Sequence, residues 1–102
     1  MIEYRTVFQK KDQLIYISHL DLMTLMRRAI RRADLPFVLT KGFTPRVKIN
    51  VPKALKLGIS SSNEEMTIWL TENIKDADVA DVINKELPEG IKITSIKSGK
   101  AA

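Results

Sequence analysis

Residues 17–46 read ISHLDLMTLMRRAIRRADLPFVLTKGFTPR, and this stretch is the most informative part of the chain. Ser18 stands where the hydroxyl of a helix N-cap can accept a hydrogen bond from a free amide of the first turn. Asp21 follows three residues later and completes a variant of the capping box. At the other end, Pro36 disfavours helical geometry at Leu35. The sequence therefore predicts one helix that begins after Ser18 and stops by Leu35.

This helix has two distinct faces when it is projected at 100° per residue. Its apolar face comprises Leu22, Met23, Leu25, Met26, Ala29, Ile30 and Ala33. Its polar face comprises Thr24, Arg27, Arg28, Arg31 and Arg32. The pattern predicts that the apolar face packs on a sheet and that four guanidinium groups project together. Because like charges one turn apart repel each other, an anion bound there would be favourable.

Four other segments alternate apolar and polar residues with the period of a strand. They are residues 2–9, 47–51, 65–71 and 91–96. In the second of these, the polar positions give the strand a basic outer face, and in the last the period slips at Ser95. Residues 10–13 predict a polar turn, residues 14–17 a short extended limb, and residues 52–63 a loop.

A second helix and the order of the elements predict the fold class. Asp76 can cap this helix, which ends at the proline and glycine of residues 88–90. Its apolar positions follow helical spacing and are Val79, Val82, Ile83 and Leu87. Strand, helix, strand, strand, helix, strand is the ferredoxin-like arrangement. We therefore expect a single α+β domain in residues 1–97, a βαββαβ sandwich whose antiparallel sheet carries both helices on one face, and a flexible tail at residues 98–102.

Three blocks of sequence resemble one known family. They read SHLDLM at residues 18–23, RRADLP at residues 31–36 and GFTPR at residues 42–46. The family is the radical-SAM-linked domain of unknown function, which occurs beside or fused to radical S-adenosylmethionine proteins. The resemblance extends from about Tyr4 to Glu65 and implies a radical S-adenosylmethionine protein as partner. Members look longer than this chain, so we expect it to form the first part of a longer domain.

Three positions depart from the family pattern. Asp34 stands where the family usually has glycine, Thr44 where it has asparagine, and Val47 where a second proline is common. These differences concern the turns around the blocks and leave the blocks themselves in place.

Composition excludes several kinds of site. The chain has no cysteine, which removes disulfides, cysteine-ligated zinc, iron–sulfur ligation and thiol catalysis. One histidine without several spaced carboxylates does not make a metal site, and no phosphate-binding glycine loop or dinucleotide fingerprint is present. We therefore expect neither a metal nor another cofactor, and an independent enzyme is disfavoured. No run of about 18 apolar residues and no secretory leader occurs, so we expect a cytoplasmic protein without a membrane partner.

Positive charge is concentrated in the first part of the chain. Residues 1–58 carry 12 Lys and Arg against 4 Asp and Glu, giving +8, whereas residues 59–102 carry 5 against 8, giving −3. A localised positive field attracts polyanions, of which nucleic acid is the commonest, although an acidic protein surface or a plain solvated face would also account for it. Guanidinium groups hold phosphate oxygens in a planar fork. The predicted nucleic-acid-binding residues are Arg27, Arg28, Arg31, Arg32, Lys41, Arg46 and Lys48.

Trp69 is expected on the sheet face that the helices leave open, because it alternates with Ile68 and Leu70. There it would lie near Arg46 and Lys48 on the adjoining strand. Two interpretations fit this position. Trp69 is either a stacking platform for nucleobases or part of a docking surface for a partner or for the remainder of a longer protein.

His19 is the single histidine and lies beside the helix cap. Histidine is the commonest general acid–base group in enzymes, which makes His19 a catalytic candidate. Asp21 is close in sequence but points to another side of the helix, so no second acid–base group accompanies His19. A structural histidine hydrogen-bonded near the cap is the alternative.

These observations support three hypotheses about function. The first is a non-catalytic accessory module that binds structured RNA and works with a radical S-adenosylmethionine enzyme. The second is a module that docks onto that enzyme without binding nucleic acid. The third is a metal-independent RNA endonuclease that uses His19. The partner class follows from the resemblance, and the preference for RNA follows from the distribution of charge.

Overall fold

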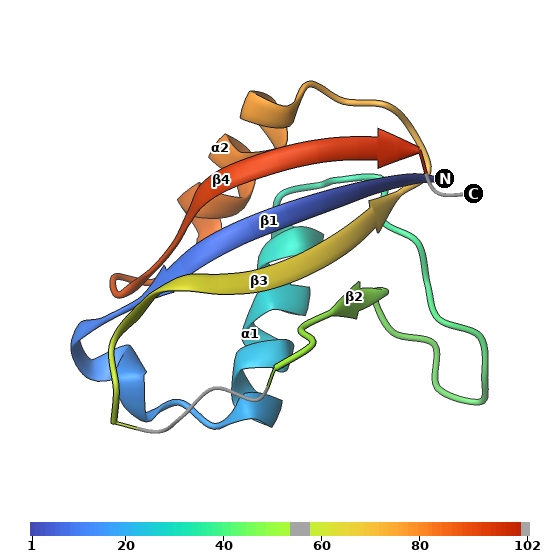
Figure 1. The fold of residues 1–102 in the computed structure, drawn as a ribbon. Helices are drawn as coiled ribbons and strands as arrows, with labels where there is room; N and C mark the ends of the chain where they lie inside the picture. The colour runs from blue at the N-terminus through green and yellow to red at the C-terminus, as the bar shows by residue number, and fades with distance from the viewer. Residues whose placement is uncertain (54–57, 101–102) are drawn as a thin grey trace.

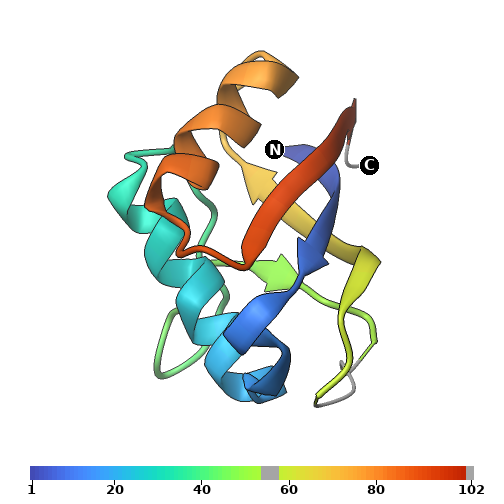
Figure 2. The same ribbon diagram turned by 90° about the vertical axis from the view of Figure 1, so that its left-hand side faces the viewer.

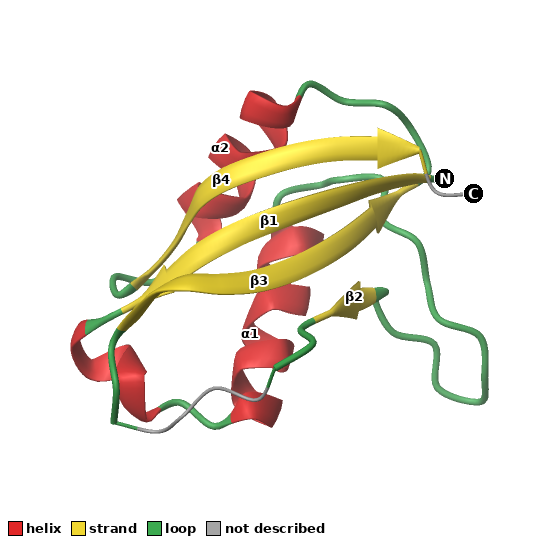
Figure 3. Cartoon of the chain, in the orientation of Figure 1, coloured by secondary structure: helices red, strands yellow, loops and turns green. Residues whose placement is uncertain are grey.

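The computed structural model describes residues 1–53 and 58–100. Its elements are β1 (Ile2–Lys10), the 3-10 helix η1 (Asp12–Tyr16), α1 (His19–Arg32), β2 (Ile49–Asn50), β3 (Ser61–Leu70), α2 (Asp76–Glu86) and β4 (Ile91–Lys100). Figure 3 colours the chain by these elements. Their order is the predicted alternation of strands and helices, with the short η1 added.

The strands form one layer and the helices a second layer behind it (Figures 1 and 2). The four strands are ordered β2-β3-β1-β4, and every neighbouring pair is antiparallel. Both helices cover the same face of the sheet, and the opposite face is left open. The predicted α+β, ferredoxin-like fold is confirmed. Its two sheet edges, β2 and β4, lie on opposite sides of the molecule.

Alternation along the strands and helical periodicity produce one apolar core between the two layers. The buried residues of β1 and β3 include Tyr4, Phe8, Met66, Ile68 and Leu70. The helices contribute Leu22, Met26, Ala29, Ile30, Val79 and Ile83. Burying a large apolar side chain of this kind stabilises the fold by about 1.5–3 kcal/mol. The faces predicted for the strands and for α1 are therefore the faces that the core uses.

The segment before α1 corrects one prediction. The sequence predicts a short extended limb at residues 14–17, but the structure has η1 there. The chain turns immediately after β1, where Asp12 has a positive φ of 57° and the Lys11 amide donates to the Gly90 carbonyl at 2.8 Å. Residues 14–17 therefore do not pair with a strand. The predicted cap is confirmed, because the Ser18 hydroxyl accepts from the Asp21 amide at 3.1 Å.

The predicted strand at residues 47–51 is mostly irregular, and only β2 remains as a regular strand. After α1, the Val38 amide donates to the Trp69 carbonyl at 3.2 Å, so the chain first pairs with the end of β3. It then turns back on itself, and the Lys48 amide donates to the Val38 carbonyl at 2.7 Å. Residues 38–48 therefore form a short hairpin at the sheet edge. The alternation itself is confirmed, since Val47 and Ile49 are buried.

The ends of α2 and β4 differ from the prediction. Asp76 does not cap α2: Lys75 is the N-cap, and the Asp76 carboxylate accepts instead from the Ser98 amide at 3.2 Å. β4 also continues through Lys100 instead of ending near residue 97, because its last residues pair with the start of β1. Ala101 and Ala102 lie outside the described residues. The predicted slip of period is confirmed, since Val7 pairs with Ser95 and Phe8 with Ile93, which leaves one residue as a bulge.

Candidate nucleic-acid interface

The four arginines of α1 do not form one surface. Arg27 is half-buried, and its Nε donates to the Val47 carbonyl at 3.1 Å. Arg31 is exposed, and its guanidinium lies over the Phe37 ring at 4.9 Å from the ring centre. Both side chains therefore lie on the flank of α1 that faces the hairpin. Each is held by a contact that the spacing along the helix could not show.

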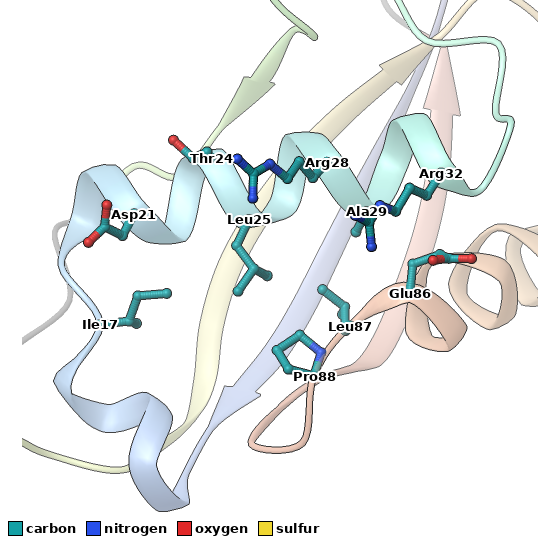
Figure 4. A pocket seen from close by; sticks show the side chains of 10 residues that line it. All are labelled: Ile17, Asp21, Thr24, Leu25, Arg28, Ala29, Arg32, Glu86, Leu87 and Pro88. Carbon is teal, nitrogen blue, oxygen red and sulfur yellow. The ribbon is translucent and has the colours of Figure 1, made fainter.

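Arg28 and Arg32 lie on the other flank, where they line a groove between α1 and the end of α2 (Figure 4). The groove has a volume of about 570 Å³, an apolar floor that includes Leu87, and two carboxylates, Asp21 and Glu86, in its walls. Figure 4 shows Arg32 extending toward the end of α2 that carries Glu86. Because carboxylates repel phosphate, this flank suits a polyanion less well than the flank of Arg27 and Arg31 does.

The hairpin is closed by a pair of hydrogen bonds between its two limbs. The Thr40 amide donates to the Arg46 carbonyl at 2.7 Å, and the Arg46 amide donates to the Thr40 hydroxyl at 3.0 Å. Gly42 has a φ of 137°, a value that favours glycine, and Pro45 has a fixed φ. The loop of residues 41–45 extends beyond the sheet edge at the lower right of Figure 1. It is therefore a defined protrusion with a clamped base.

The exposed side chains of this loop are cationic and aromatic. Lys41 and Arg46 are exposed at either end of the loop. Phe43, between them, has 108% of the reference exposure of a phenylalanine. The sequence prediction included the two cations but missed Phe43. An aromatic residue enclosed by turn formers, with Gly42 before it and Pro45 after it, was the signal that could have found it.

Trp69 lies on the open face of the sheet, as predicted, and is half-buried. The Lys48 ammonium lies 4.7 Å from the centre of its ring, which is within the range of a cation–π contact. A hollow of about 480 Å³ adjoins the ring on this face, and its lining carries both signs of charge. The charged residues of the lining are Glu3, Arg5, Glu65 and Lys97. Glu3 and Arg5 pair with each other at 3.0 Å.

Charge separates along the sheet from one edge to the other. No acidic residue occurs between Asp34 and Glu64, whereas five Lys and Arg do, of which Lys56 lies outside the described residues. Residues 72–89, which contain α2, carry six Asp and Glu and two Lys. We name the positive side the basic edge and define it by Arg27, Arg31, Lys41, Arg46 and Lys48. The structure thus brings together five of the seven predicted nucleic-acid-binding residues and leaves Arg28 and Arg32 in the groove.

His19 is the first residue of α1 and is half-buried. Its Nδ1 atom is buried and has no hydrogen-bond partner among the described residues. The hydrogen bond expected of a structural histidine near the cap is therefore not made by this nitrogen to any residue that the structure describes. Within the described ranges, no group of three or more His, Asp and Glu side chains is arranged to hold a metal ion.

The fold and this edge define a small α+β domain with a basic protruding hairpin. The chain belongs to a family described as uncharacterized proteins conserved in bacteria (DUF2344), which it matches over residues 3–102. A search of the curated proteins found no match to the chain. Among the described residues, no helix is long and apolar enough to cross a membrane.

Proposed function

We propose that this chain is a non-catalytic RNA-recognition module that binds structured RNA through the basic edge. The supporting observation is that Lys41, Arg46 and Lys48, from a segment without acidic residues, lie at one edge of the sheet beside Arg27 and Arg31 of α1. From the resemblance described above, we further propose that it presents this RNA to a radical S-adenosylmethionine enzyme.

The contacts of the basic edge suit phosphate. Neither Lys41 nor the guanidinium of Arg46 is paired with a carboxylate among the described residues, so both cations are free to neutralise a phosphate group. Arg31 is held on the ring of Phe37, which orients its guanidinium at the edge without neutralising its charge. Cations fixed along one edge attract a polyanion at long range and release its counterions on contact.

A salt titration with a charge-matched control tests this proposal. We expect the triple variant K41Q/R46Q/K48Q to bind a stem–loop RNA more weakly than the parent. The slope of log K against log[salt] should fall by about 2–3, since each phosphate contact accounts for roughly 0.7–0.9. The control K75Q/K85Q/K92Q removes the same charge from the N-cap of α2, from α2 and from β4, and it should leave the slope nearly unchanged. Equal losses in both variants would show only an effect of net charge.

The open sheet face supports a second candidate function, docking onto the radical enzyme. The hollow next to Trp69 is lined by charges of both signs. Its two carboxylates, Glu3 and Glu65, make it unfavourable for a polyanion. A protein surface can instead complement both signs. A half-buried tryptophan is also a common central residue of protein interfaces. The two functions use different faces, so one chain can have both.

A further inference from the structure

We propose that Phe43 is a stacking residue for an unpaired nucleobase and that the hairpin loop carrying it recognises looped-out or single-stranded nucleotides. The inference rests on the proposed RNA binding by the basic edge. It goes further by naming the class of nucleotide recognised and the residue that recognises it.

The ring of Phe43 is available in a way that two other aromatic rings are not. Arg31 lies over the ring of Phe37, and Lys48 lies over the ring of Trp69. Among the described residues, no cation lies over Phe43, and its side chain is fully exposed. A base can stack on a bare aromatic face without displacing a protein group. Phe43 therefore suits this role better than Trp69, which the sequence had suggested.

The loop is arranged to present this ring without large reorganisation. Its base is clamped by the two hydrogen bonds between Thr40 and Arg46, and the ring of Pro45 fixes one backbone angle between them. A loop held in one conformation loses less conformational entropy when it binds. The fold does not require an apolar side chain at this tip, since Phe43 makes no contribution to the buried core.

The charges beside the ring indicate a nucleic acid as the occupant. Lys41 and Arg46 flank Phe43 in the loop, so phosphates on both sides of a stacked base would meet a cation. Alternating aromatic and basic groups are the composition of surfaces that bind single-stranded nucleic acid. In a duplex the bases stack on one another, so an aromatic ring can stack only on a base that has left the helix. The preferred substrate is therefore an unpaired segment.

A lipid surface is the competing occupant, since exposed phenylalanine beside lysine or arginine also inserts into anionic membranes. The distribution of cations favours RNA. The basic edge continues from the loop along the hairpin to Lys48, which lies over Trp69, and to Arg31 on α1, which lies over Phe37. A membrane that accommodates the tip of the loop would contact the cations nearest the tip, whereas a folded RNA can follow the whole edge.

Three substitutions at one position separate ring stacking from general hydrophobicity. Binding is measured with a fluorescently labelled RNA hairpin that has an unpaired uridine loop and with a blunt RNA duplex of the same length. We expect Phe43→Ala and Phe43→Leu to lower the affinity for the hairpin roughly tenfold or more, with an unchanged salt slope. Phe43→Trp should retain the affinity. No variant should alter binding to the duplex, and each should unfold at the same temperature as the parent because Phe43 is fully exposed.

Any other result contradicts either stacking by Phe43, RNA binding by the basic edge, or both. If Phe43→Ala binds the hairpin like the parent while K41Q/R46Q/K48Q does not, stacking is wrong and the basic edge stands. If neither variant changes binding, both proposals fail. If Phe43→Leu retains the affinity, the aromatic ring is not required and stacking is again wrong. If the parent sediments with phosphatidylserine vesicles, Phe43→Ala does not, and RNA binding is the same for both, the loop recognises lipid instead.

A spectroscopic measurement tests contact directly. The double variant W69F/F43W places the single tryptophan at the tip of the loop. Its fluorescence should be quenched by the uridine-loop hairpin and not by the blunt duplex. Quenching by neither RNA, with binding still present, would contradict stacking at this position.

Discussion

The basic edge and the α2 side of this domain differ in both charge and attachment. Three of the five residues of the basic edge, Lys41, Arg46 and Lys48, lie in a segment without acidic residues, whereas residues 72–89 on the α2 side carry six acidic residues against two lysines. They occupy opposite edges of one sheet because of the strand order β2-β3-β1-β4 and because α2 lies next to β4. The separation gives the domain a positive and a negative side. A polyanion approaching it would be oriented toward the hairpin before contact.

The two sides are also held differently. α2 is tied to β4 by Asn84, whose side chain donates to the Ile93 carbonyl at 3.1 Å and accepts from the Ile93 amide at 2.8 Å. The hairpin is anchored at its base by Arg27 and Arg31, while its loop extends away from the core. Under the proposed function, the hairpin has the binding role and α2 has a structural role.

Charge reversal at the loop is the strongest test of this difference. The variant K41E/R46E should bind stem–loop RNA at least roughly 100-fold more weakly at low salt, because two attractive contacts become repulsive. The matched control K85E/K92E makes the same charge change on α2 and β4. It should lower the affinity by less than about threefold. Comparable losses in the two variants would remove the distinction between the sides. Affinity is measured by fluorescence anisotropy.

Removal of the Asn84 side chain tests the attachment of α2. Asn84→Ala should lower the free energy of unfolding by about 2 kcal/mol, because both main-chain groups of the buried residue Ile93 lose their partner. Asn73→Ala, at an exposed position, should change it by less than about 0.5 kcal/mol. The free energies of unfolding of both variants are measured by urea denaturation, with Trp69 fluorescence as the probe. RNA affinity of the folded Asn84→Ala variant should equal that of the parent, and a loss there would connect α2 to the binding site.

Trp69 separates RNA binding from docking on the open face. Trp69→Ala should weaken association with the proposed radical S-adenosylmethionine partner by about 2 kcal/mol if this face is the docking surface. The RNA affinity should stay nearly constant, because Lys48 already covers the ring. Leu20→Ala, at an exposed apolar position on α1, serves as the control. A loss of about 1–3 kcal/mol in RNA binding would instead identify Trp69 as a stacking platform. Calorimetry with each ligand measures the two affinities.

The division of the arginine face predicts unequal effects on stability. Arg27→Met should lower the free energy of unfolding by about 1 kcal/mol, since the Val47 carbonyl loses a partly buried charged donor. Arg28→Met should change it by less than about 0.5 kcal/mol, because its guanidinium has no hydrogen-bond or ion-pair partner among the described residues. Both free energies are measured by thermal and by urea unfolding. If the two variants lose equal stability, the two flanks of α1 are not distinct.

The sequence predicted the candidate site only in part. Lys41, Arg46 and Lys48 were predicted as cations of one surface, and the hairpin brings them to one edge. Arg28 and Arg32 were assigned to the same surface, because helical spacing gives the angle of a side chain but not the element that packs beside it. The exposure of Phe43 was not predicted, since a phenylalanine is more often buried than exposed.

The amino-acid sequence was sufficient to predict the fold class, the two faces of α1, the cap at Ser18 and the concentration of positive charge. The cap and the helix faces depend on residues within about one helical turn, and the fold class follows from the order of such local patterns along the chain. The tertiary structure alone decided that Asp76 binds Ser98, that Arg27 binds Val47, and that the basic and acidic segments lie on opposite edges. Each of these pairs residues or segments far apart in sequence, so its outcome depends on how the layers pack and on which backbone groups remain without a partner.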